Sequence, residues 1–255
     1  MRIARHLFAT FVLMAPVQMA SAQQIEVIEQ VIEFDAFAEV EVRADGTSRL
    51  IQIFDIERAS PDEAAQNRLK EQIAKRIGQW KFSPPTLDGA AVDARTFVRI
   101  GMEAEVNEGG GFTVRVVRAY TGPRAVYRVQ PGYPKSAAKV GAEGRVVLLL
   151  SVNSQGQVAS VKVESSDASP GSKSSLRQFE TVAQRAVKLW RFQMETVDGK
   201  PMEMRMRVPV DFCMEDGSSW CDKQWGKHST NADDREMAAI DPAVKLLTSV
   251  SEPGT

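Results

Sequence analysis

The chain has 255 residues, with 32 basic and 33 acidic side chains, two histidines and two cysteines. A nearly neutral chain gives no electrostatic basis for binding nucleic acid or an anionic membrane surface. The length is enough for one large or two small domains, each with a modest core. No stretch after the N-terminal segment is apolar over the length that a bilayer requires, so we expect no spanning helix in the mature chain.

The first 22 residues are typical of a secretory signal peptide. Arg2 and Arg5 give a positive start, residues 7–15 are apolar, and residues 20–22 (Ala-Ser-Ala) form a small-x-small cleavage site. The apolar run is too short to cross a hydrocarbon core of about 30 Å at about 1.5 Å per residue. We therefore expect cleavage after residue 22 and export of the chain. The alternative is an uncleaved segment that acts as a marginal anchor.

Residues 23–107 predict a first β-β-α-β unit. The expected elements are strands at 38–42 and 50–56 around the turn Asp45-Gly46, a helix with the apolar stripe Leu69, Ile73, Ile77 and Trp80, and a third strand at 95–106. Alternating apolar residues predict the strands, and apolar residues three or four positions apart predict the helix. Residues 108–130 are expected to be a linker with one more strand at 112–120. The run 107–111 (Asn-Glu-Gly-Gly-Gly) is typical of a flexible joint.

Residues 131–215 predict a second unit of the same kind. The expected elements are strands at 145–152 and 158–163 around a turn with Gly156, a loop at 165–175, a helix with the apolar stripe Phe179, Val182, Ala183, Ala186, Val187 and Trp190, and a third strand at 202–212. Pro209 in that last strand cannot donate a ladder hydrogen bond. At least one side of the strand should therefore be unpaired or bulged there.

Equivalent features of the two segments lie 110 positions apart. They are Trp80 and Phe82 against Trp190 and Phe192, Asp88-Gly89 against Asp198-Gly199, and Asp45-Gly46 against Gln155-Gly156. Such a constant offset indicates an internal repeat. The predicted fold class is therefore α+β, with two tandem β-β-α-β units and antiparallel sheets. Because the aromatic pairs fall on the apolar stripes, core packing is favoured over ligand stacking for them.

Four short motifs follow one another in the second unit. They are Tyr133-Pro134, Glu143-Gly144, Trp190-Arg191-Phe192 and Val208-Pro209-Val210. With this order and spacing, the segment at about 131–212 resembles the C-terminal domain of TonB-family energy transducers. The first unit, at about 34–106, resembles the same domain only from its first strand onward, as a degenerate copy.

In that family the domain is a periplasmic α+β module that grips a short segment of an outer-membrane receptor by strand addition. The resemblance implies a periplasmic protein-binding module here, with a TonB-dependent receptor or another envelope protein as its partner. The partner-binding residues that we expect lie on the last strand and are Glu203, Arg205, Arg207, Pro209 and Asp211. The alternative is an interior strand, paired on both sides, with a solvated charged face. Pairing of edge strands between two copies could also produce a homodimer.

Family transducers keep an uncleaved N-terminal helix and a long proline-rich spacer, and the sequence shows neither feature. We therefore expect a soluble binding module. The alternative is an energy transducer whose N-terminal segment remains as an anchor and couples the inner membrane to receptor-mediated uptake.

We expect no enzymatic activity, no cofactor and no metal. After signal cleavage His228 is the remaining histidine, and it lies in a polar stretch where nothing would hold it as a base. No glycine-rich phosphate loop joins a strand to a helix. Cys213 and Cys221 lack the two further soft ligands of a metal site. In an exported chain they predict a disulfide, worth about 2–3 kcal/mol on loop-entropy grounds.

Residues 216–255 are expected to form a polar tail with a short helix. The pair Asp241-Pro242 is typical of a helix cap and first turn. The apolar residues at 243, 244, 246 and 247 follow at helical spacing.

Overall fold

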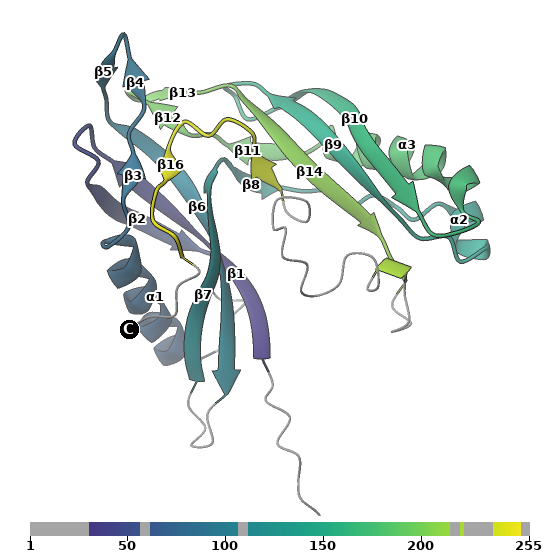
Figure 1. Ribbon diagram of the computed structural model, residues 1–255, viewed down its shortest axis with the longest axis horizontal. Helices are drawn as coiled ribbons and strands as arrows, with labels where there is room; N and C mark the ends of the chain where they lie inside the picture. Colours follow the sequence, from purple (N-terminus) through teal and green to yellow (C-terminus); the bar gives the residue numbers. More distant parts are fainter. Residues whose placement is uncertain (1–30, 57–61, 107–111, 215–219, 222–236, 251–255) are drawn as a thin grey trace, which may run out of the picture.

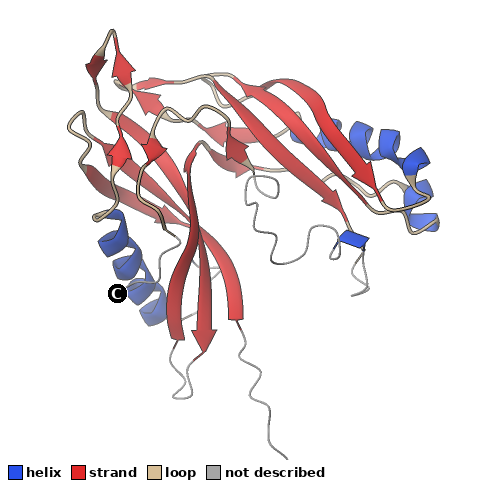
Figure 2. Ribbon diagram, in the orientation of Figure 1, coloured by secondary structure: helices blue, strands red, loops and turns tan. Residues whose placement is uncertain are grey.

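The computed structural model describes residues 31–56, 62–106, 112–214, 220–221 and 237–250. The predicted signal peptide with its cleavage site, and the predicted joint at 107–111, lie outside the described residues. The described chain is an α+β structure, with antiparallel strands in every sheet and two longer helices (Figures 1 and 2).

The first part of the chain contributes most of the strands of the first sheet. The strand order is β13-β12-β6-β1-β2, with β7 also beside β6, and β12 (Thr196–Val197) and β13 (Lys200–Pro201) come from later in the chain. The elements of residues 31–127 are β1 (Val31–Val42), β2 (Ser48–Phe54), α1 (Glu63–Ile77), β3 (Phe82–Ser83), β4 (Thr86–Leu87), β5 (Ala90–Ala91), β6 (Ala94–Val106), β7 (Phe112–Gly122) and β8 (Arg124–Tyr127). The strands predicted at 38–42, 50–56, 95–106 and 112–120 all occur, and β1 and β7 extend beyond their predicted bounds.

Helix α1 covers this sheet with the apolar stripe that its sequence predicts. Leu69, Ile73 and Ile77 are buried among the apolar side chains of β1 and β6. Asp62 caps the helix, because its carboxylate accepts hydrogen bonds from the backbone N–H groups of Ala64 and Ala65. Such a cap satisfies amides that have no partner within the helix. Trp80 and Phe82, just after the helix, are buried in the same core.

The second part of the chain builds a four-stranded sheet with the order β10-β9-β14-β15. The elements that follow residue 127 are α2 (Lys135–Lys139), β9 (Gly144–Val152), β10 (Val158–Ala168), the 3-10 helix η2 (Lys173–Ser175), α3 (Leu176–Val187), β11 (Arg191–Gln193), β12 (Thr196–Val197), β13 (Lys200–Pro201), β14 (Met204–Phe212), β15 (Ala238–Ala239) and β16 (Lys245–Leu246). β10 continues five residues beyond the predicted 158–163, since its polar end still pairs with β9 as far as Gly144.

Helix α3 packs on the second sheet through Phe179, Ala183 and Val187, all fully buried. Trp190 and Phe192 follow the helix and are buried in this core. The predictions that the tryptophan–phenylalanine pairs serve packing are confirmed. The indole N–H of Trp190 donates to the backbone oxygen of Val129, 2.9 Å away, so the polar end of the ring is also satisfied.

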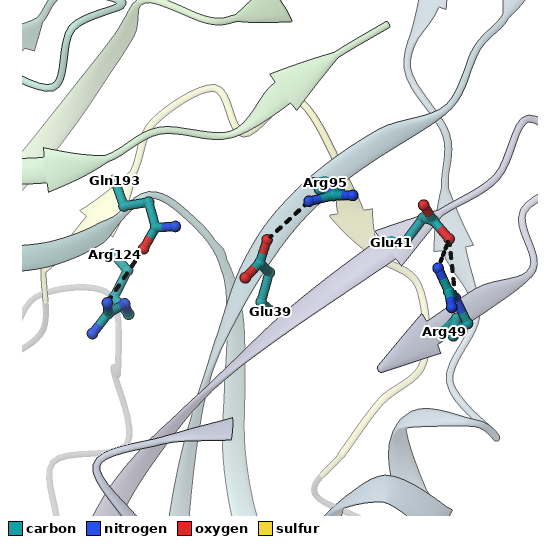
Figure 3. A network of polar contacts seen from close by, with 6 residues as sticks. All are labelled: Glu39, Glu41, Arg49, Arg95, Arg124 and Gln193. Carbon is teal, nitrogen blue, oxygen red and sulfur yellow. Dashed lines mark hydrogen bonds and ion pairs between the residues drawn. The ribbon is translucent and has the colours of Figure 1, made fainter. Parts of the chain in front are cut away.

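The two sheets are joined by short pieces of strand. β12 pairs with the start of β6, through Thr196 with Arg95 and Val197 with Ala94. Nearby, β8 pairs with β11. Figure 3 shows the polar contacts of this region, with the Arg124–Gln193 hydrogen bond (3.2 Å) beside the Arg95–Glu39 ion pair (3.6 Å) and the Arg49–Glu41 ion pair (2.9 Å).

The C-terminal segment 237–250 connects both sheets, and the predicted helix at 241–247 is wrong. Figure 1 shows this segment in yellow, running from β14 across to β3. β15 pairs with β14, and β16 pairs with β3 through Leu246 and Phe82. Val244 between them is fully buried in the first core. The local helix signal is overridden because an extended chain both buries Val244 and pairs with two separate strands.

Candidate functional site

β14 has the alternating pattern that its sequence predicts. Its inward side chains are Met204, Met206, Val208, Val210 and Phe212, all buried in the second core. Its outward side chains are Arg205, Arg207, Pro209 and Asp211. Glu203 is exposed and directly precedes the strand. The five predicted partner-binding residues therefore lie together on the outward face of one strand or beside its start.

The two edges of β14 differ in how far they are paired. The inner edge pairs with β9 over the whole strand, from Met204 to Phe212. On the outer edge β15 pairs only with Met206 and Arg207. Within the described chain no strand pairs with Val208–Phe212 on that outer side. Among the described residues, β14 is thus an interior strand in its first half and an edge strand in its second half.

The backbone groups of the open half can be assigned to a side. The oxygen of Arg205 accepts a hydrogen bond of 2.9 Å from the N–H of Ile240, so the backbone groups of Arg205 point to the outer edge. Successive residues of a strand point their backbone groups to alternate sides. The oxygen of Pro209 and both backbone groups of Asp211 therefore also face outward. The missing N–H of Pro209 falls on this edge, where proline is tolerated in a sheet.

The outward side chains of β14 are held in ion pairs. Arg207 forms a double contact with Glu164 of β10 at 2.7 and 2.8 Å, and this hydrogen bonding lowers the pKa of Glu164. Asp211 forms a double contact with Arg145 of β9 at 2.5 and 2.7 Å. Arg205 pairs with Asp241 of the C-terminal segment. Planar double contacts of this kind fix side-chain direction as well as charge.

A groove of about 630 Å³ runs beside the open half of β14. Pro209, Val210 and Trp190 form its wall on the second sheet. Residues of the first sheet and of the connection after β7 form the opposite wall, including Asp35, Phe37, Arg99, Arg124 and Arg128. The sequence gives no signal for this second wall, because its residues come from β1, from β6 and from the segment after β7, which are far apart in the chain.

The end of β14 is fixed by a disulfide and a buried carboxylate. Cys213 and Cys221 are bonded, with their Cα atoms 5.8 Å apart, as the sequence predicts. Glu143 is 5% exposed, and its two carboxylate oxygens accept from the N–H groups of Met214 (2.7 Å) and Trp220 (2.6 Å). One carboxylate therefore holds both sides of the disulfide loop next to the open edge.

In the described ranges no group of three or more histidine, cysteine, aspartate or glutamate side chains is arranged to hold a metal ion. Nor does any helix of these ranges have the length and apolar character needed to cross a bilayer. The chemistry that the arrangement around β14 offers is main-chain hydrogen bonding, with charged side chains beside it.

Several motif residues of the second segment have a direct structural role. The ring of Tyr133 contacts Phe179 and Phe212 edge-on, each with ring centres 5.8 Å apart, and its hydroxyl donates to the oxygen of Ala142. Burial raises the pKa of this hydroxyl. Gly144 leaves room for the ring of Phe179, because a β-carbon on the glycine would come within 3.0 Å of it.

The comparisons with known proteins cover this same segment. The family of the Gram-negative bacterial TonB protein C-terminal matches residues 129–214. Protein TonB of Xanthomonas campestris pv. campestris (strain B100) is 34% identical over 84 residues, which cover 33% of this chain and 34% of that protein. Protein TonB of Vibrio cholerae serotype O1 is 32% identical over 88 residues, covering 34% and 33%. Protein TonB of Salmonella typhimurium is 38% identical over 81 residues, covering 32% and 29%.

The match thus spans about a third of the length of these curated relatives. It includes α2, β9, β10, α3 and β14, and therefore the whole partly open edge described above. Residues 129–214 of this chain are a C-terminal domain of the TonB family.

Proposed function

We propose that this chain is a TonB-like protein-binding module of the bacterial envelope, and that an extended segment of a partner protein adds to β14 at Val208–Phe212. The observation that carries the proposal is the outer edge of β14, which is paired at Met206 and Arg207 and, within the described residues, has no strand partner beside the groove from Pro209 onward. Added strands obtain affinity from main-chain hydrogen bonds and selectivity from alternate side chains.

The partner class that we propose is a TonB-dependent outer-membrane receptor, met in the periplasm. The support is that the domain carrying the open edge matches proteins named TonB in three Gram-negative organisms. A binding role also agrees with the nature of TonB proteins, which are energy transducers and not enzymes.

We also propose that residues 31–106 and 144–212 are two copies of one unit. β4 and β5 lie 110 positions before β12 and β13. The sheet orders β2-β1-β6 and β10-β9-β14 correspond element by element. The turn residues Asp88 and Asp198 share a positive φ, 51° and 49°. A positive φ is uncommon outside glycine, so its recurrence at this offset supports a common plan.

A site-specific photo-crosslinker tests the binding site. We would place it at position 209 of the full chain and, as a control, at Gln72 on the exposed side of α1, and irradiate cells that express each variant. The proposal expects adducts with an outer-membrane protein from position 209 and none from position 72. Absence of adducts at 209, or equal adducts from both positions, contradicts strand addition at β14.

The N-terminal mass of the exported protein decides between the soluble module and the anchored transducer. A chain that begins at Gln23 supports the soluble periplasmic module. A chain that keeps its first 22 residues in the membrane fraction supports the transducer.

A further inference from the structure

The first sheet already contains a strand in the position that is open in the second. β7 pairs antiparallel with β6 along its outer edge, and Val98, Arg99, Ile100, Gly101 and Met102 lie opposite Thr121, Tyr120, Ala119, Arg118 and Val116. β12 occupies the start of the same edge, opposite Ala94 and Arg95. The outer edge of β6 is therefore filled from one end to the other by segments of the same chain.

β14 corresponds to β6 when the two copies are aligned, so this inference rests on the proposed function. The cross-strand pair Asp35 and Gly101 of β1 and β6 corresponds to Arg145 and Asp211 of β9 and β14. The open stretch Val208–Phe212 then corresponds to residues 98–102, which β7 covers. β7 on β6 shows in one molecule how an extended segment fits this edge.

The charges at the two positions are also related. In the first sheet the carboxylate of Asp35 accepts from two guanidinium groups, Arg99 at 2.7 Å and Arg118 of β7 at 3.2 Å. In the second sheet the carboxylate of Asp211 is paired with Arg145, and its side chain is still 38% exposed. A residue opposite Asp211 on an added strand would reach this carboxylate, as Arg118 reaches Asp35.

We propose that β14 binds an extended segment antiparallel to itself, in the register that β7 shows on β6, with a basic residue opposite Asp211. The carboxylate of Asp211 then contacts two cationic side chains, Arg145 of β9 and the basic residue of the partner. The residues opposite Val208 and Val210 face the core side of the sheet, where β7 has Thr121 and Ala119, so small side chains fit there.

Pro209 weakens the pairing between β14 and the added strand. Arg99, its counterpart in the first sheet, lies opposite Tyr120 and has an N–H to give to the added strand. Pro209 has no N–H, so one hydrogen bond of the β6–β7 ladder has no equivalent on β14. The bound segment is accordingly held more weakly than β7 is, and it can exchange.

The probe is a synthetic peptide with the sequence of residues 113–122, blocked at both ends and titrated against the full chain. Backbone amide shifts should change at 208–212, and a spin label at the peptide N-terminus should broaden the amide signals near Phe212 rather than those near Val208. An Arg118→Glu peptide should bind at least about tenfold more weakly, because it places a carboxylate opposite Asp211. An Asp211→Asn protein should lose most of that difference.

A second variant tests the backbone pairing of β14 and leaves the charge of Asp211 unchanged. Pro209→Thr restores an N–H and should tighten binding of the peptide about 2- to 10-fold, the effect of one net hydrogen bond. Any of three results overturns the proposal. They are amide shift changes confined to residues 98–102, broadening by the spin label near Val208, and equal affinities of the arginine and glutamate peptides. If the crosslinker at 209 still captures an outer-membrane protein in that case, strand addition stands and only the register and the basic residue are wrong.

Discussion

Arg118 lies opposite Gly101 across β7 and β6, and its side chain fills the space directly over the glycine. From there its guanidinium reaches Asp35 on the next strand, β1, at 3.2 Å. Glycine is needed at position 101 because it leaves room for the side chain of Arg118. Its backbone does not require glycine, because its φ is not positive. The side chain of Arg118 thus links β7 to β1 across β6, because Gly101 has no side chain to block its path.

Gly101→Ala should therefore destabilise the protein by about 1–3 kcal/mol. The added β-carbon would overlap the side chain of Arg118 and displace it from Asp35. Urea unfolding measures the change, with Gly132→Ala as the control, since nothing lies within 4 Å of a β-carbon there. Equal midpoints for the two variants would show that Arg118 moves aside at no cost.

The C-terminal segment offers a second matched pair. Val244 is fully buried in the first core, while Leu247, three residues later, is 63% exposed. Val244→Ala should cost about 1–3 kcal/mol, because it leaves a cavity in the first core. Leu247→Ala should cost less than about 0.5 kcal/mol, since its backbone bond to Lys81 is kept. Thermal or urea unfolding of both variants would test whether the segment is an integral part of the fold, and similar small losses would argue against it.

The sequence predicts the parts of the fold that depend on local pattern. The alternation in β14 and the stripe of α3 give the correct faces, because each buries its apolar side against one neighbour. The prediction of a helix in the C-terminal segment is wrong because Val244 is buried in a core whose other buried residues lie between positions 36 and 116, more than a hundred positions away. Local spacing carries no information on such contacts.

The same distinction applies to the site. The proline of β14 correctly indicates an edge, since the missing N–H is a local property of residue 209. Two other features of the site depend on how distant segments meet. β15 covers half of this edge, and Asp35 and Arg128 border the groove on the other side. No residue pattern in those segments points to β14.

The disulfide loop at the end of β14 gives a third prediction. Replacing Cys213 and Cys221 together by serine should destabilise the protein by about 2–3 kcal/mol. Glu143→Gln should weaken the same loop, because an amide offers one acceptor where the carboxylate offers two to Met214 and Trp220. Unfolding in urea with and without a reductant measures both effects. A Glu143→Gln protein as stable as the parent would contradict the role of this carboxylate.

Glu195 is a fully buried carboxyl group at the junction of both sheets and the C-terminal segment. It is hydrogen-bonded to the hydroxyl of Thr96 on β6, and its other oxygen accepts from the N–H of Ala243 at 2.9 Å. Burial raises the pKa of this carboxyl group above its ordinary value of 4.5, although the hydrogen bonds partly oppose the shift. At pH values between 4.5 and the raised pKa, the folded protein therefore binds more of this proton than the unfolded chain does.

The free energy of unfolding should accordingly fall as pH rises from about 4.5 through the raised pKa of Glu195, by at most about 1.4 kcal/mol per pH unit. Glu195→Gln should remove this slope, since its amide can donate to the Thr96 hydroxyl and its oxygen can accept from Ala243. Urea unfolding at several pH values tests it, with the exposed Glu33→Gln as a control that keeps the parental slope. A Glu195→Gln protein with that same slope would show that other groups cause the pH dependence.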